Sequence, residues 1–179
     1  MLTPYNEILI QQVDSSKATY SAAIADFVPV ATATDICALI GSSTKKVTLT
    51  TMQITGSASA NTYLGFYLYK RSTLNTGGTP TATAICKYDT NDPTATALVN
   101  QYAANPTTGT GILMRSDHLT LVGTASTILP TNPIIWEYGA RTAKSPVLLN
   151  ATESLCLNCN GATIPAGINV HIFIEWTEE

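Results

Sequence analysis

The feature that most constrains the fold of this chain is a regular alternation of apolar and polar residues near its C-terminus. Within the nine residues 168–176, apolar side chains fall on every second position: Ile168, Val170, Ile172, Ile174 and Trp176. Successive side chains of a β-strand point to opposite faces, so this period of two predicts a strand with one buried face. Because nine residues are long for an edge strand, we expect this strand to lie in the middle of a sheet and to end at a charged tail, Glu178–Glu179.

Further strand-like patterns recur along the chain at roughly regular spacing, and no stretch predicts a long helix. Together they predict about eight to ten strands, at residues 19–30, 35–41, 45–56, 62–71, 112–124, 133–139, 146–149, 153–160 and 168–176. This spacing is typical of an all-β sandwich or jelly roll of antiparallel strands. At 179 residues we expect one domain, with a body at 19–179, an N-terminal arm at 1–18 and a long irregular insertion at 72–111. Within that insertion, residues 95–104 fit either a short strand or one or two helical turns.

The strand predicted at 45–56 changes phase halfway along its length. Val47 and Leu49 are in one register, whereas Met52 and Ile54 are in the other. An extra residue at Thr50–Thr51 would bring all four side chains onto one face. We therefore predict a β-bulge at this point.

The strand predicted at 62–71 has an aliphatic face and an aromatic face. Leu64, Phe66 and Leu68 share the face that we expect in the core, and the tyrosines that share the other face are Tyr63, Tyr67 and Tyr69. A tyrosine combines a large rigid area with a polar tip, and is common in protein interfaces. These three residues are the candidate contact surface. The alternative is that the segment which follows simply covers them.

The four cysteines do not indicate a metal site or a disulfide framework. Cys156 and Cys159 lie three positions apart on a predicted strand, where their thiols would point to opposite faces, and Cys37 and Cys86 stand alone. The N-terminus lacks a basic region followed by an apolar one, so we expect no signal peptide and expect synthesis in a reducing cytosol. The cysteines are therefore expected to be free, buried small apolar residues.

Residues that could perform catalysis are few. The two histidines, His118 and His171, lie on polar faces of predicted strands, and no Gly-x-Ser-x-Gly motif is present. A glycoside hydrolase would need two carboxylates at a fixed separation. The acids available for such a pair are Asp89, Asp92, Asp117, Glu137 and Glu153. Nothing in the sequence brings them together, so we expect no catalytic residues, no cofactor and no enzyme activity.

The charge content limits the choice of partner. Charged residues make up 12% of the chain, and the net charge is −3 with only nine Lys and Arg residues. This is too little positive charge for the basic stripe that binds a phosphate backbone, so we expect no nucleic-acid partner. No apolar run approaches the roughly 20 residues that cross a bilayer, so we also expect no membrane anchor.

Several phrases of the sequence resemble a group of small virion proteins of tailed bacteriophages. They occur in loops and at the C-terminus, within residues 45–179: Tyr69–Thr79, Asp92–Ala97, Tyr102–Thr107 and Ile172–Glu179. The resemblance implies a structural protein of the phage particle. It does not supply a site motif.

A low-charge, Thr-rich β domain with no active site, an N-terminal arm, a tyrosine face and a long irregular loop is suited to being held by neighbours. In role it most resembles a capsid decoration or cement protein, made in the host cytoplasm and located in the virion. Such a protein would be a jelly-roll module that binds and stabilises the shell of the major capsid protein or contacts other virion proteins. It would form a homo-oligomer, with a trimer favoured. The alternatives are a tail adaptor or a receptor- or glycan-binding tail protein and, more remotely, a carbohydrate-active enzyme.

Overall fold

The computed structural model describes residues 17–123, 132–139 and 144–179. Most of the arm predicted at 1–18 lies outside these residues, as do most of the turn predicted at 127–133 and part of the charged loop at 140–145.

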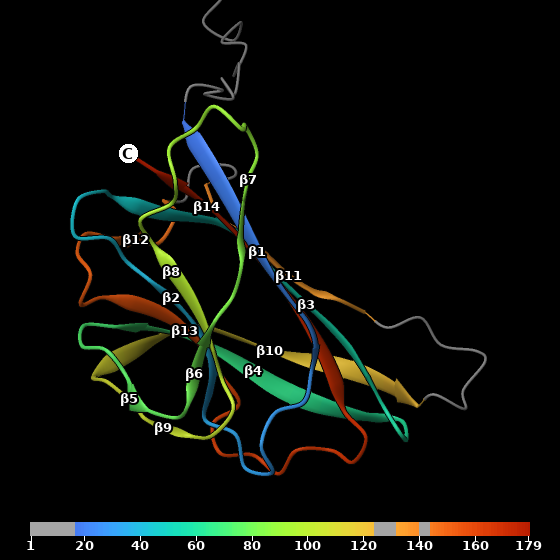
Figure 1. Cartoon of the computed structure of the whole chain (residues 1–179). Helices are drawn as coiled ribbons and strands as arrows, with labels where there is room; N and C mark the ends of the chain where they lie inside the picture. Colours follow the sequence, from blue (N-terminus) through green and yellow to red (C-terminus); the bar gives the residue numbers. More distant parts are fainter. Residues whose placement is uncertain (1–16, 124–131, 140–143) are drawn as a thin grey trace, which may run out of the picture.

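The described residues form fourteen strands and no helix, so the protein is all-β (Figure 1). Nine strands have four or more residues, which agrees with the predicted eight to ten. These are β1 (Ala18–Phe27), β2 (Asp35–Ile40), β3 (Val47–Ala58), β4 (Thr62–Arg71), β8 (Leu98–Tyr102), β10 (Gly111–Gly123), β11 (Ile134–Glu137), β13 (Ser154–Asn158) and β14 (Asn169–Glu178). The others have two or three residues: β5 (Thr76–Gly77), β6 (Pro80–Ala82), β7 (Ile85–Lys87), β9 (Pro106–Thr107) and β12 (Val147–Leu148).

Twelve of the strands form one curled sheet whose two halves face each other across the core, and β5 and β9 pair with each other in a separate two-stranded sheet (Figure 1). We call the half ordered β7-β1-β14-β3, with β11 and β12 on the far side of β3, sheet A. The half ordered β6-β8-β2-β13-β4-β10 is sheet B. The two halves join where Val122 and Gly123 of β10 pair with Ser57 and Ala58 of β3. This short contact is parallel, whereas the sequence predicted antiparallel strands throughout.

The long strands pair in a nested order along the chain. The first, β1, pairs with the last, β14, and β2 pairs with β13. Inside these pairs, β3 pairs with β11 and β12, and β4 pairs with β10. Strands far apart in the sequence therefore become neighbours, and these four nested pairings are all antiparallel.

The C-terminal strand occupies the position that its alternation predicted. β14 lies between β1 and β3, and the five alternating apolar side chains from Ile168 to Trp176 are all buried. The strand was predicted to end before a charged tail at Glu178–Glu179, but β14 includes Glu178 as its last residue, and this residue is buried. Its carboxylate accepts hydrogen bonds from the backbone N–H groups of Thr96 and Ala97 and from the indole of Trp176. Burial raises the pKa of Glu178, but these bonds outweigh it and the net pKa is lowered.

The predicted bulge in β3 is confirmed. Glu175 of β14 pairs with Thr51 and Trp176 pairs with Leu49, so Thr50 is the extra residue. Leu49 and Met52, on the two sides of the bulge, are both fully buried. The bulge therefore gives β3 one continuous inner face, as its phase change required.

The insertion at 72–111 contains only short strands, of which β6, β7 and β8 extend the two halves of the sheet. β7 pairs with β1 at one edge of sheet A, and β6 and β8 follow β2 at one edge of sheet B. Residues 98–102, for which strand and helix were both open, form strand β8. The insertion also lies over part of the outer face of sheet B, where it joins a network of polar contacts around Asp35 and Arg71.

Candidate interaction surface

The three tyrosines singled out in the sequence do lie on the outer face of β4. Their neighbours Leu64, Phe66 and Leu68 point into the core, as predicted. Tyr63 is 70% exposed, and its ring meets the ring of His118 edge to face, with 5.6 Å between the ring centres. The two side chains come from adjacent strands, because β10 pairs with β4 along most of its length.

Tyr67 lies over the backbone of Gly65, its neighbour on the same face. A Cβ atom added at Gly65 would lie 3.0 Å from the Tyr67 hydroxyl and 3.2 Å from its ring. The absence of a side chain at Gly65 therefore lets the ring lie flat along the strand. Together these residues line an open groove that is completed by the loop after β13, with Thr62, Tyr63, Leu64, Gly65, Tyr67, His118, Ala162, Thr163 and Pro165 as its lining.

Tyr69, the third tyrosine, lies in different surroundings from the other two. The guanidinium carbon of Arg71 lies 5.0 Å from the centre of its ring, within the range of a cation–π contact. Both residues line a second hollow, together with Thr34, Thr108, Asn158, Asn160 and Gly161. The structure thus brings Tyr63 and Tyr67 together at one groove and places Tyr69 beside a buried charge.

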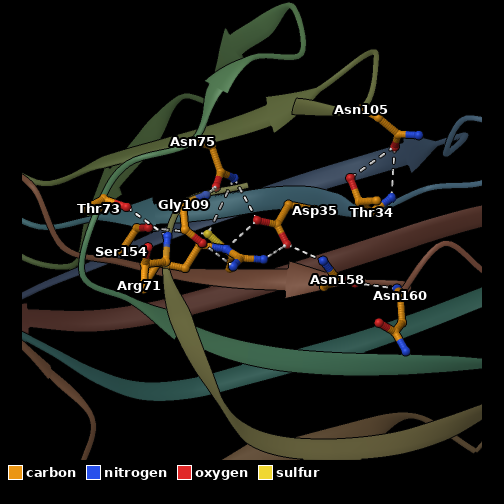
Figure 2. A network of polar contacts seen from close by, with 12 residues as sticks. Thr34, Asp35, Arg71, Thr73, Asn75, Asn105, Gly109, Ser154, Asn158 and Asn160 are labelled. Atoms are coloured by element: carbon orange, nitrogen blue, oxygen red, sulfur yellow. Dashed lines mark hydrogen bonds and ion pairs between the residues drawn. The ribbon is translucent and has the colours of Figure 1, made fainter. Parts of the chain in front are cut away.

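That charge belongs to an ion pair between Arg71 and Asp35, which are 5% and 1% exposed (Figure 2). Arg71 Nε donates to Asp35 Oδ2 at 2.6 Å, and Nη2 donates to Oδ1 at 2.7 Å. This is the two-pronged geometry that makes arginine–carboxylate pairs strong. Asn75 donates a further hydrogen bond to Oδ2 at 2.7 Å, and Asn158 donates one to Oδ1.

The network reaches from sheet B into the insertion that covers it. Arg71 Nη1 donates to the carbonyl oxygen of Gly109 at 2.7 Å, and the Gly109 N–H donates to Asn75 Oδ1 at 2.9 Å. A Cβ atom at Gly109 would lie 2.0 Å from the carbonyl oxygen of Thr73, so only glycine fits this crossing of two loop segments. The two ends of the insertion are therefore tied to sheet B through one buried charge pair.

The electrostatics of this cluster keep its charges fixed and its thiol inert. Burial lowers the pKa of Arg71, but the hydrogen bonds and charge of Asp35 outweigh it and the net pKa is raised. Burial raises the pKa of Cys156 to about 12, and burial together with nearby acidic groups raises that of Tyr102 to about 12. These groups are therefore suited to holding the structure together, and not to exchanging protons near neutral pH.

The alternative interpretation, that the following segment covers the tyrosine face, holds at one end of that face only. At the Tyr69 end, the insertion lies over the sheet and shields the Arg71–Asp35 pair (Figure 2). At the Tyr63 end, the face is open to solvent. The role of the tyrosines in an interface stays a prediction.

The cysteines are all free, and three of the four are buried as expected. Cys156 packs with Ala38 and Tyr102 under the insertion, whereas Cys37 and Cys159 belong to the core between the sheets. Cys156 and Cys159 therefore diverge, as the strand geometry predicted. The prediction was wrong for Cys86, which is exposed because β7 lies at the edge of sheet A.

The acids and histidines are spread over the fold. Asp117 is on β10 and Glu137 is on β11, whereas Asp89 and Asp92 share a surface turn and Glu153 precedes β13. Both histidines are exposed. Among the described residues, no group of three or more His, Cys, Asp and Glu is placed to hold a metal ion.

Two features of this surface were not foreseen from the sequence. The first is the buried Arg71–Asp35 pair, whose only sequence signal is a charged residue at the end of one strand and another at the start of a second. The second is the exposure of the first half of β10, which carries the apolar residues Ile112, Leu113 and Met114. A run of apolar residues normally predicts burial, so their exposure is the opposite of what the sequence indicates.

No helix that could cross a membrane occurs in the part of the chain that the structure describes. Comparison of the chain with known protein families, with curated proteins and with solved structures finds no match.

Proposed function

We propose that this chain is a non-enzymatic structural protein of a tailed-phage virion, a capsid decoration or cement protein that binds and stabilises the shell of the major capsid protein. The observation that carries the proposal is the nested pairing of β1 with β14, β2 with β13, β3 with β11 and β12, and β4 with β10. Nested antiparallel pairs wound around one core are the arrangement of a jelly roll, which occurs in viral capsid domains and lectins. A fold alone does not determine function, so the role also has to be supported by the surface of the protein.

The surface supports a role in binding other proteins. It carries few charges, an open groove with two tyrosine rings, and a strand with exposed apolar residues. Large apolar side chains grouped at a surface mark sites of contact with other proteins. A homo-oligomer, with a trimer favoured, seated on the capsid shell would cover such a surface.

The test of this proposal is the copy number of the protein in purified virions. A decoration protein is expected on the order of hundreds of copies per particle, because it follows the symmetry of the shell. Quantitative densitometry against the major capsid protein measures this number. About twelve copies or fewer, or absence from the particle, would contradict the decoration role.

Replacing Tyr67 by serine is expected to weaken assembly and to leave the monomer folded. Tyr67 is half-buried at the groove, so its loss removes contact area for a partner while the core side of β4 stays intact. Sedimentation velocity measures the assembly, and circular dichroism measures the fold. Tyr88→Ser is the matched control, because Tyr88 is exposed beside β1 and away from this face. Equal assembly of the wild type and Tyr67→Ser would exclude the tyrosine face as an interface.

The groove favours one alternative, a receptor- or glycan-binding tail protein. Rings such as Tyr63 and Tyr67 can stack on the apolar face of a sugar, and hydroxyl groups such as those of Thr62 and Thr163 can bind its hydroxyls. A glycan array distinguishes the two roles. Binding that is lost in Tyr63→Ala, together with a copy number of a few dozen or fewer, would favour the tail protein.

A further inference from the structure

Strand β10 is the edge of sheet B over most of its length. It pairs with β4 from Gly111 to Leu121. On its other side, only Val122 and Gly123 pair with another strand among the described residues, in the short contact with β3. Along Gly111–Leu121 the backbone N–H and C=O groups on that side are therefore not paired with any strand that the structure describes, as in an open sheet edge.

The side chains along this edge are apolar, whereas edge strands that avoid pairing with other chains usually carry charged side chains. Ile112 is 78% exposed, Leu113 is 44% exposed and Met114 is 43% exposed. All residues from 111 to 118 are exposed, so neither face of this half of the strand is covered. A long edge strand with exposed apolar side chains is a site where another chain adds a strand.

Two opposite charges follow these apolar residues on one face of the strand. Arg115 pairs with Leu68 of β4 and Asp117 pairs with Phe66, so both point to the core side of sheet B. The Arg115 guanidinium lies over the rings of Trp136 on β11 and of Tyr138 just after it, at 5.8 and 5.9 Å from the ring centres. Neither Arg115 nor Asp117 forms an ion pair with another residue that the structure describes.

We propose that the free edge of β10 pairs antiparallel with the β10 edge of a second copy of this chain, about a two-fold axis through Ser116. Paired residues of an antiparallel ladder lie on the same face, so a two-fold axis perpendicular to the sheet must pass through a residue pair. An axis through Arg115 would place two arginines opposite each other, and an axis through Asp117 would place two aspartates opposite each other. An axis through Ser116 places Arg115 of each copy opposite Asp117 of the other.

This register pairs both the charged and the apolar residues of the free edge. Two opposite-charge pairs form across the axis, and each contributes to strand pairing. Because β10 has a bulge at Met114, Ile112 lies on the core side of sheet B and faces Leu119 of the other copy, so the apolar residues at one end of the edge lie against the neighbouring copy. Sheet B then continues from one copy into the other, with the core sides of both copies on the same face.

The proposal goes beyond the decoration role, because it holds whatever the protein binds in the particle. The proposal also concerns the symmetry of the homo-oligomer. A two-fold contact closes after two copies, so it does not build the favoured trimer. A dimer of the purified chain would replace the trimer expectation without deciding the place of the protein in the virion.

The first test reverses the charges one at a time and then together. Arg115→Asp and Asp117→Arg each place like charges opposite each other twice, so each is expected to raise the dimer dissociation constant by about tenfold or more. The double variant Arg115→Asp/Asp117→Arg exchanges the two charges and is expected to restore dimerisation. Asp89→Arg is the control, because Asp89 lies in an exposed turn away from β10. Analytical ultracentrifugation measures the mass, and circular dichroism shows that each variant is folded.

The second test reads the register directly by cross-linking. The two copies of Ser116 face each other across the axis at the Cα separation of about 4.5 to 5.5 Å found in antiparallel pairs, which a disulfide can span. Ser116→Cys, in a Cys86→Ser background that removes the exposed thiol, is therefore expected to form a disulfide-linked dimer under mild oxidation. Thr120→Cys in the same background is the control. The proposed register places its two copies roughly 27 Å apart, from eight residues at the strand rise.

Three results would overturn the proposal. These are a wild-type chain that is monomeric or trimeric at high concentration, failure of the exchanged double variant to recover when both single variants are folded, and equal cross-linking of Ser116→Cys and Thr120→Cys. If another segment or another protein occupies the edge, the single reversals leave self-association unchanged, and this outcome also overturns it.

Discussion

Replacing Trp176 by alanine is expected to lower the free energy of unfolding by about 3 to 5 kcal/mol, the range for deleting a large aromatic side chain from a core. Trp176 is fully buried in the central strand β14, and its ring stacks on that of Tyr20 with 5.9 Å between the ring centres. Its indole N–H donates to Glu178, whose carboxylate also holds the backbone of Thr96 and Ala97. The substitution therefore leaves a cavity in the core and removes one donor from a buried carboxylate.

Two matched variants separate these contributions. Trp176→Phe keeps a ring at the position and removes the indole donor, so it is expected to cost less than the alanine variant. Thr177→Ala changes the opposite face of the same strand and is expected to cost less than about 1 kcal/mol. Denaturant unfolding followed by far-UV circular dichroism is the suitable measurement, because the chain has only two tryptophans and the substitution removes one of them. A change below about 1 kcal/mol in Trp176→Ala would show that the terminal strand is peripheral to stability.

Replacing Asp35 by alanine is expected to cost a similar amount, about 3 to 5 kcal/mol, for a different reason. Asp35 accepts hydrogen bonds from Arg71, Asn75 and Asn158, and the Arg71 side chain is only 6% exposed. Without the carboxylate, a positive charge stays buried with no opposite charge beside it. Two amide groups also lose a partner, which adds to the cost.

A double-mutant cycle tests this explanation. Adding Arg71→Met to Asp35→Ala removes the unpaired charge, so the double variant is expected to be more stable than Asp35→Ala alone. Lys46→Ala is the control, because its ion pair with Glu179 is exposed and is expected to contribute less than about 1 kcal/mol. Additive losses at Asp35 and Arg71 would show that the two side chains do not act as a pair.

The same variant should also loosen the insertion that covers sheet B. Asn75 and Gly109 hold the insertion through the Arg71–Asp35 pair, so Asp35→Ala is expected to speed proteolytic cleavage within residues 72–111 more than cleavage elsewhere. Peptide mapping of early cleavage sites measures this.

Much of the local structure of this protein follows from its sequence. The alternation at Ile168–Trp176 predicted a central strand, the phase change at Thr50 predicted a bulge, and Leu64, Phe66 and Leu68 were placed correctly in the core. Each of these depends on which face of a strand a side chain points to. That choice is local, because the period of two is a property of the extended backbone.

The candidate sites could not be predicted in the same way. The Asp35–Arg71 pair joins β2 to β4 across β13, and no pattern within either strand signals the other. Cys156 and Asn158 look like outward-facing residues of β13, yet they are buried because an insertion about fifty residues away in sequence lies over them. Likewise, Ile112 is exposed because β10 is an edge strand, and a strand is an edge only by virtue of its neighbours.

The amino-acid sequence by itself determined that the chain forms strands, which side chains of most strands face inward, and where a strand must bulge. Tertiary structure alone decided the nested pairing order, the burial of one charge pair beneath the insertion and the free edge of β10. The physical reason is that side-chain direction is set by the backbone within a few residues. Neighbourhood in a sheet is set by contacts between segments that can lie more than a hundred residues apart, such as β1 and β14.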